Sequence, residues 1–190
     1  MMKKIQLITL FLFLGTANLL AQKDASVEES IYGVQLRLLG LSGHNERRLS
    51  DQFALRTEVG FSGGIGQGFY ERDVFFILIP EISVAGRWYY NLQKRLDKGR
   101  NISKNSGNFI ALKLGYQPDW FKISSEDNID LKNSVYSSLK WGIKRTILKH
   151  LTYEAGIGLG VGAYFDHYQG ENFTTTYGFL DLHLRIGYTF

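Results

Sequence analysis

The sequence has no cysteine and only two prolines among its 190 residues. The lack of cysteine excludes disulfides, cysteine-ligated metal sites and thiol nucleophiles. After the first 21 residues there is also no apolar run long enough for a transmembrane helix, because the strongest one, VFFILIP, is broken at Pro80 and Glu81. No segment shows sustained helical periodicity. These absences exclude a helical membrane protein.

The first residues, MMKKIQLITLFLFLGTANLLAQ, have the parts of a secretory signal peptide. Lys3 and Lys4 precede an apolar run, and the small residue Ala21 marks a cleavage site. A membrane anchor is the alternative, but the run is interrupted and shorter than the ~20 residues that a spanning helix needs. We therefore predict a cleaved signal peptide over 1–21, a short segment over 22–30 and a β-barrel domain over 31–190.

The predicted mature chain loses two lysines and retains 20 basic and 18 acidic residues, so its net charge is +2. A charge this close to zero argues against a dedicated nucleic-acid binder. Aromatic residues and glycine are abundant, with 13 Phe, 11 Tyr, 3 Trp and 21 Gly. This composition is typical of a β protein with tight curvature.

Apolar and polar residues alternate along LDLHLRIGYTF, which places Leu182 and Leu184 on one face and Asp181 and His183 on the other. The same period of two recurs over 31–41, 53–62, 75–90, 109–116, 135–144 and 151–165. The polar stretches between them, such as SGHNERRLSD and HYQGENFTT, are predicted links of an antiparallel meander. Seven strands are convincing, and because bacterial barrels have an even number, we expect an eighth within 63–79 or 119–130.

The apolar face points inward in a soluble barrel and outward, to lipid, in a transmembrane barrel. Trp88, Tyr90, Tyr188 and Phe190 lie on the apolar face at strand ends, where an interfacial girdle belongs. Four glycines at 156–162 share the polar face, which fits a narrow lumen crossed by long side chains. We therefore predict an all-β, antiparallel up-and-down transmembrane barrel, most simply of eight strands. Its predicted lumen charge network is Arg37, Arg56, Glu58, Glu81, Arg87, Lys113, Lys140, Lys144, Glu154, Asp181, His183 and Arg185.

The ending LRIGYTF resembles the C-terminal assembly signal of Gram-negative outer-membrane proteins, and GRWYYNLQKR is similar to strands of their small β-barrel family of about eight strands. The resemblance implies an outer-membrane location and contact with outer-membrane lipid. It also implies insertion by the barrel-assembly machinery, with Tyr188 and Phe190 in the assembly signal.

Other candidate sites have plainer interpretations. Asp181, His183 and Arg185 suggest a catalytic cluster, but residues two apart on a strand stack along the lumen and form no triad by themselves. The histidines His44, His150 and His167 are expected in solvated links, without metal-ligand spacing. The loop SEDNID offers Glu126, Asp127 and Asp130 to a cation but lacks EF-hand spacing, and GGIGQG at 63–68 is expected to be a flexible link.

A basic run comprises Lys94, Arg95, Lys98, Arg100 and Lys104. It is expected to be a solvated turn, with contact to lipid phosphates or a periplasmic partner as the alternative. The sequence as a whole predicts a non-enzymatic outer-membrane barrel with a structural, adhesive or narrow-channel role and no catalytic, cofactor or metal site. A lipid-modifying barrel enzyme and a soluble periplasmic lipocalin-like barrel stay open as alternatives.

Overall fold

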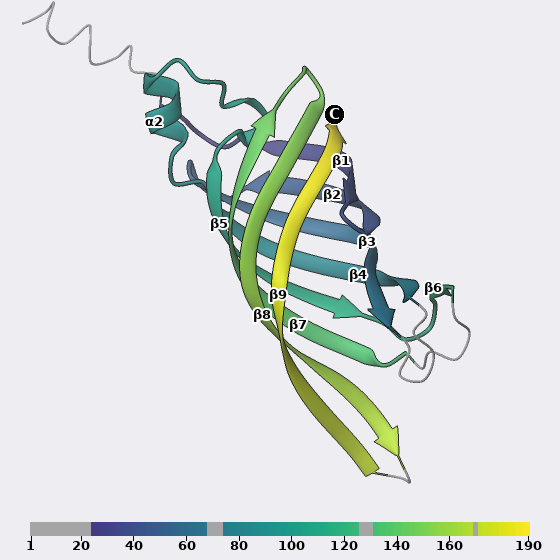
Figure 1. The fold of residues 1–190 in the computed structure, drawn as a ribbon. Coiled ribbons are helices and arrows are strands. Elements are labelled where there is room, and N and C mark those ends of the chain that lie inside the picture. Colours follow the sequence, from purple (N-terminus) through teal and green to yellow (C-terminus); the bar gives the residue numbers. More distant parts are fainter. Residues whose placement is uncertain (1–23, 68–73, 126–130, 169–170) are drawn as a thin grey trace, which may run out of the picture.

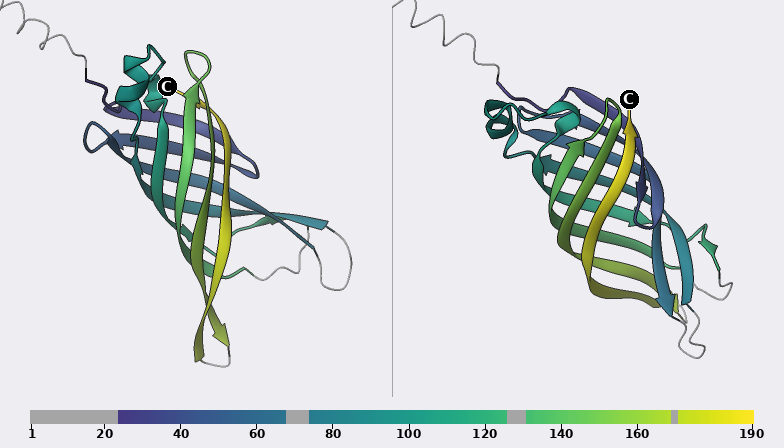
Figure 2. Two further views of the ribbon diagram at one scale, coloured as in Figure 1. Left: turned by 60° about the vertical axis from the view of Figure 1, so that its left-hand side comes forward. Right: turned by 45° about the horizontal axis from the view of Figure 1, so that its top comes forward.

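The computed structural model describes residues 24–67, 74–125, 131–168 and 171–190, so the predicted signal peptide lies outside them. Its strands are all antiparallel, and eight of them close into a ring in the order β3-β2-β1-β9-β8-β7-β5-β4, with β4 pairing back onto β3. The ring strands are β1 (Ser30–Arg37), β2 (Gly40–Arg48), β3 (Phe53–Gln67), β4 (Val74–Trp88), β5 (Asn108–Gln117), β7 (Asn133–Thr146), β8 (Leu151–Tyr168) and β9 (Glu171–Thr189). Figures 1 and 2 show the up-and-down barrel that these strands form.

The eighth strand is β2, which the sequence analysis wrongly assigned to a polar link. β2 pairs with β1 and with β3 over its whole length. Its outward positions include Gly43, Asn45 and Arg47, so β2 nearly lacks the apolar face by which the other strands are recognised in the sequence. Gly40 begins the strand at a φ of 127°, and a side chain there would collide with the main chain of Phe61.

The two regions proposed for the eighth strand have other structures. The described parts of 63–79 extend β3 and β4, so GGIGQG as far as Gln67 belongs to a strand and is not a flexible link. In 119–125, the described part of the other region, the structure has only the two-residue β6 (Ile123–Ser124), which pairs with β4. Most of HYQGENFTT is likewise strand, because β8 and β9 form a hairpin that projects beyond the ring (Figure 1).

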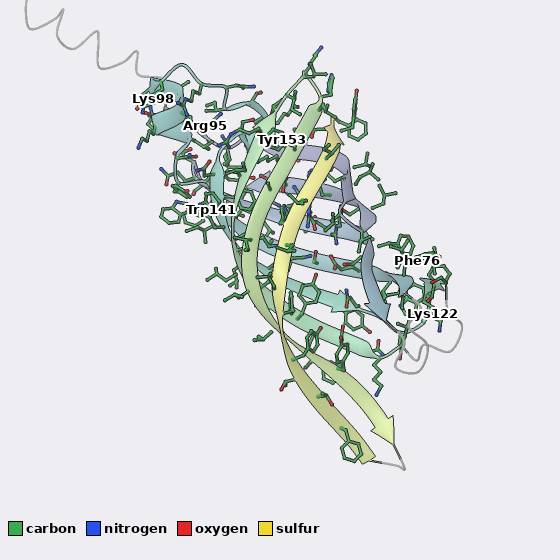
Figure 3. The ribbon with its side chains drawn as sticks, viewed as in Figure 1. Phe76, Arg95, Lys98, Lys122, Trp141 and Tyr153 are labelled. Carbon is green, nitrogen blue, oxygen red and sulfur yellow. The ribbon has the colours of Figure 1, made fainter. Side chains whose placement is uncertain are left out.

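In the structure, side chains lie on the faces that the alternation in the sequence predicts, because successive residues of a strand point to opposite faces. On β9, Leu182, Leu184 and Ile186 face outward and are half exposed, whereas His183 and Arg185 are buried inside the ring. Figure 3 shows outward side chains along the whole wall, with Trp141 on β7 as a labelled example. The barrel therefore has an apolar outside and a charged inside.

The end of the barrel that carries the C-terminus also carries the β7–β8 turn and the helix α2 (Leu92–Asp97), and we call it the α2 end (Figure 1). The helix is followed by the short 3-10 helix η1 (Ser103–Asn105). A small apolar core closes this end of the interior. It consists of Ala25, Val27, Ala54, Tyr89, Leu92, Phe109 and Ala111. Within the described residues no helix has the length and apolarity needed to cross a membrane.

Candidate functional site

All twelve residues of the predicted charge network line the interior, and the structure brings them into contact with one another. Nine of them, together with Glu46, form two groups along the barrel axis, joined by an ion pair between Arg56 and Glu58. The other three are Lys140, Asp181 and His183. The central cluster consists of Glu46, Arg56, Arg87, Lys144 and Glu154. The mouth cluster lies nearer the β8–β9 end and consists of Arg37, Glu58, Glu81, Lys113 and Arg185.

Two glutamates hold the central cluster together. Glu46 Oε2 is 3.2 Å from both Arg56 Nη1 and Lys144 Nζ, and 3.4 Å from Arg87 Nη1. Glu154 Oε2 is 2.9 Å from Arg87 Nη2, and Glu154 Oε1 is 3.3 Å from Arg56 Nη1. Both glutamates are fully buried, so their charges are retained only because these cations surround them.

Neutral groups complete the hydrogen bonding of Glu46. The hydroxyl of Tyr89 donates to Glu46 Oε1 at 2.8 Å, and the side-chain amide of Asn105 donates to the same oxygen at 2.6 Å. Asn105 lies in η1 with a φ of 58°, a conformation that asparagine tolerates better than most residues. The cluster thus ties the strands to the segment that closes the α2 end.

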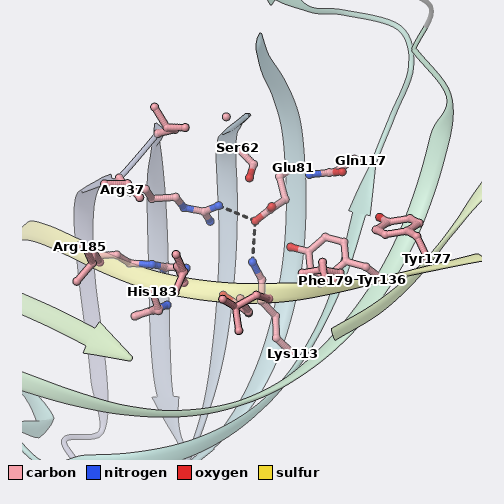
Figure 4. Close-up of a pocket in the computed structure, with 17 residues that line it drawn as sticks. Arg37, Ser62, Glu81, Lys113, Gln117, Tyr136, Tyr177, Phe179, His183 and Arg185 are labelled. Atoms are coloured by element: carbon pink, nitrogen blue, oxygen red, sulfur yellow. Dashed lines mark hydrogen bonds and ion pairs between the residues drawn. The ribbon is translucent and has the colours of Figure 1, made fainter. Parts of the chain in front are cut away.

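Two glutamates also organise the mouth cluster. Arg37 bridges them, with Nη2 at 2.8 Å from Glu58 and Nη1 at 2.8 Å from Glu81. Lys113 Nζ is 2.8 Å from Glu81, and Arg185 pairs with Glu58. Figure 4 shows Arg37 and Lys113 both reaching the carboxylate of Glu81.

A cavity of about 310 Å³ lies over the mouth cluster (Figure 4). Its floor is charged, and three aromatic side chains, Tyr136, Tyr177 and Phe179, line one wall. The rings of Tyr136 and Phe179 meet edge to face at 5.7 Å. The cavity therefore offers both charged and apolar surface.

The residues around His183 do not form a nucleophile and base. The hydroxyl of Ser138 donates to Asp181 at 2.6 Å rather than to His183, and Lys140 Nζ is 2.6 Å from the same carboxylate. His183 Nε2 is hydrogen-bonded to Glu154 at 2.8 Å. A hydroxyl bonded to a carboxylate alone lacks the base that a serine nucleophile requires.

Glu46, one of the two acids that hold the central cluster together, was missed by sequence reasoning because its strand was read as a link. Its cross-strand neighbour supplies a signal that could have found it, since Glu46 on β2 stands opposite Arg56 on β3. Lys144 and Glu154 are opposite each other in the same way, as are Glu154 and Arg185. Complementary charges at facing positions therefore indicate the strand register.

The expectation that the three histidines lie in links is wrong for His44 and His167, which lie on strands, whereas His150 lies in the β7–β8 link. His44 lies on β2 and is buried, and neither ring nitrogen has a hydrogen-bond partner within the described residues. His150 is half-buried, with Nδ1 2.8 Å from the Thr189 carbonyl oxygen and its ring stacked on Tyr188. His167 lies within β8 rather than in a link. The proposed cation ligands Glu126, Asp127 and Asp130 lie outside the described residues.

The basic run is only partly the solvated turn that was expected. Lys94, Lys98 and Arg100 are exposed, and we call these three the basic turn. Arg95 is buried against the end of the barrel and donates to the carbonyl oxygen of Asn101 at 2.8 Å. Burial, followed by the charges of Arg145 and Arg100, lowers the pKa of Arg95. Lys104 Nζ donates to the carbonyl oxygen of Phe190 at 2.9 Å.

The glycines at 156–162 leave room for neighbouring groups. A Cβ atom added at Gly160 would collide with the ring of Phe179, and one added at Gly162 with the ring of Tyr177. At Gly156 and Gly158 the collision would be with the main chain of β7. The glycines near the mouth therefore allow the aromatic wall of the cavity to lie flat against β8.

No protein-family model matches the chain, and no curated protein or solved structure matches it either. The membership of the outer-membrane barrel family that the terminal motif implies therefore stays a prediction.

Proposed function

We propose that the protein is a small, non-enzymatic β-barrel of the outer membrane, with a structural or adhesive role. The observation that carries this proposal is the inverted distribution of residue types. Arginine, lysine and glutamate fill the inside of the ring, while leucine, isoleucine, valine and aromatic residues cover the outside. A soluble protein would expose to water a continuous apolar belt far larger than monomers tolerate.

The outer surface supports a lipid-facing belt with aromatic margins. Trp88 and Tyr90 are packed together at the α2 end of β4, and Tyr188 and Phe190 at the same end of β9. Trp141 Nε1 on β7 donates to the hydroxyl of Tyr90, which follows β4, so this aromatic group spans the strand β5 that lies between them. Aromatic girdles of this kind are typical of transmembrane barrels at the membrane–water interface.

The interior favours a plugged barrel over a channel. The charged side chains cross the ring and pair with one another, and the apolar core around Tyr89, Leu92 and Phe109 closes the α2 end. Eight-stranded barrels are generally just wide enough for side chains to fill them. A narrow channel is therefore a weaker proposal than a structural or adhesive role.

The two alternatives have less support. A lipocalin-like carrier needs an apolar interior, whereas the described interior is charged. A barrel enzyme that uses His183 needs an activated nucleophile beside it, and Ser138 is bonded to Asp181 instead. Outer-membrane lipid as the surrounding partner and the barrel-assembly machinery as the insertion partner follow from the proposed location.

Cell fractionation and gel mobility test the proposal. The protein is expected in the outer-membrane fraction, and unboiled samples are expected to migrate differently from boiled ones because a closed barrel resists detergent until heated. The control is a variant in which Glu46 and Glu154 are both replaced by alanine. It should lose the heat-dependent shift in mobility, because these two residues hold the central cluster of the barrel together. Recovery of the unaltered protein as a soluble periplasmic monomer would contradict the proposal.

A further inference from the structure

The wall of the barrel is incomplete between β9 and β3 near the β8–β9 end. β1 pairs with β9 from Gly33 to Arg37, and the last main-chain hydrogen bond on this side joins Leu38 N to Leu184 O at 3.1 Å. β2 pairs with β3 as far as Ser62, and the last main-chain hydrogen bond on that side joins Gly63 N to Leu39 O at 2.8 Å. Within the described ranges, the edge of β9 preceding Leu184 therefore faces the end of β3 with no strand between them. We call this gap the side opening.

The cavity over the mouth cluster extends into the side opening. Besides its inward-facing charged residues, it is lined by residues of the β1–β2 turn, by Ser62 and Gly63 on β3, and by outward-facing leucines of β9. These leucines are Leu180, Leu182 and Leu184. One space thus connects the charged interior to the apolar outer surface.

The side opening lies at the level of the apolar belt. The outward positions of β9 are apolar from Phe190 back to Leu180, and beyond that they become Gly178, Thr176 and Thr174. The apolar stretch thus covers positions 180–190 of β9, which matches the 9–11 residues that a transmembrane strand needs. A molecule in the side opening would therefore meet hydrocarbon rather than water, if the barrel is embedded as proposed.

The charged floor carries an excess of cations. Among the described residues, the mouth cluster with Lys140 and Asp181 has four cations but only three carboxylates. The cations are Arg37, Lys113, Lys140 and Arg185, and the carboxylates are Glu58, Glu81 and Asp181. Both contacts of Arg185, to Glu58 and to the amide oxygen of Gln35, use Nη1. Within the described residues its Nε and Nη2 make no hydrogen bond, and because Arg185 lines the cavity, these nitrogens are donors for an anion there.

We propose that this cavity binds an amphiphile through its anionic head group, while the acyl chain leaves through the side opening over the leucines of β9. This inference rests on the proposed membrane location. A cavity of about 310 Å³ is at the small end of ligand sites and suits a head group with the first part of a chain. The aromatic wall contacts that first part, and the excess cation selects a carboxylate or phosphate head.

Protection of a single cysteine tests the proposal, because the natural sequence has none. A thiol at Ser62→Cys lies on the cavity lining, and a thiol at Leu159→Cys lies on the outer face of β8, away from the cavity. Each variant is purified in a non-ionic detergent, and its rate of maleimide labelling is measured with increasing dodecanoate or dodecyl phosphate. Dodecyltrimethylammonium and inorganic phosphate are the probes that separate charge from chain.

We expect dodecanoate, dodecyl phosphate or both to slow labelling at Ser62→Cys in a saturable way, with no effect at Leu159→Cys. Stronger protection by dodecanoate would indicate a fatty acid as the ligand, and stronger protection by dodecyl phosphate would indicate a lipid phosphate. Equal protection by dodecyltrimethylammonium would overturn the charge argument. Equal protection by inorganic phosphate would overturn the role of the side opening, and no protection by any probe would overturn the proposal.

Two further substitutions should change the protection of Ser62→Cys by the anions in opposite directions. Arg185→Gln removes a cation from the cavity and should weaken protection by the anions several-fold. Asp181→Asn removes a carboxylate at the rim and should strengthen it. A merely structural effect would weaken both, so two losses would count against the proposal. Arg100→Gln in the basic turn is the matched control and should change nothing.

Failure of this inference is distinguishable from failure of the proposed function. A bimane label on Leu159→Cys in vesicles reports whether the outer face of β8 contacts lipid, through quenching by brominated acyl chains. Quenching without anion protection at Ser62→Cys would overturn only the binding site. If the brominated acyl chains do not quench the bimane label, the membrane location itself would be overturned.

Discussion

Replacement of Glu46 by alanine is the most informative test of the interior, because this side chain is fully buried and contacts three cations. The central cluster has three cations and two carboxylates, so the substitution leaves Glu154 as its one carboxylate, while Arg56 keeps its pair with Glu58 of the mouth cluster. Removal of one partner from a buried ion pair typically costs about 3–5 kcal/mol, since the remaining charge is uncompensated. We expect the free energy of unfolding to fall by about this amount.

Urea titration of the barrel in lipid vesicles, followed by heat-dependent gel mobility, measures this change. The matched control is Glu29→Ala, an exposed glutamate outside the ring, which should stay within about 0.5 kcal/mol of the unaltered protein. Substitution of Lys144 by methionine in the Glu46→Ala background should recover part of the loss, because it removes one of the unmatched cations. A loss at Glu46 no larger than that at Glu29 would refute the argument that the interior is held by matched charges.

Three further predictions concern the aromatic wall, the C-terminal aromatic pair and the basic turn. Gly160→Val should destabilise the barrel by about 1–3 kcal/mol in the same titration, because the added side chain collides with the ring of Phe179. A second substitution, Phe179→Ala, should restore part of this stability, and no restoration would contradict the packing. Phe190→Asp should reduce the assembled fraction in outer membranes far more than Trp120→Asp at an exposed link, and equal tolerance would contradict the assembly-signal prediction. Substitution of all three cations of the basic turn by glutamine should reduce the amount of anionic lipid that co-purifies, because each cation contributes about 1 kcal/mol near an anionic lipid surface. Unchanged co-purification would refute lipid contact at this turn.

The sequence predicted the faces of the strands well because a period of two is a local property. Wherever one face was apolar and the other charged, as at Leu184 and Arg185, the pattern assigned each residue to the face on which the structure places it. The same local pattern predicted the interior position of Arg56, Arg87 and Glu154, but not that of Glu46. The pairings within the interior depend on register and were not accessible from alternation alone.

The missing strand and the closed end could not be predicted for specific physical reasons. β2 carries polar residues on both faces, and its interior glutamate is stabilised by residues from four other elements rather than by its neighbours in sequence. The helix α2 has only six residues, too few for a helical period to emerge. The N-terminal segment lies against α2 through Ala25 and Val27, a contact between residues far apart in sequence.

The central claim is that the apolar face of this barrel faces the bilayer and the charged face encloses the interior. Spin labels at Leu139→Cys and Leu159→Cys on the outer face, and at Gln117→Cys on the cavity lining, test it in vesicles by collision with oxygen and with a water-soluble nickel complex. The account predicts high oxygen and low nickel accessibility at the two outer sites, and the reverse at Gln117→Cys. Outer labels that collide freely with the nickel complex, with the lining label shielded from it, would contradict the account.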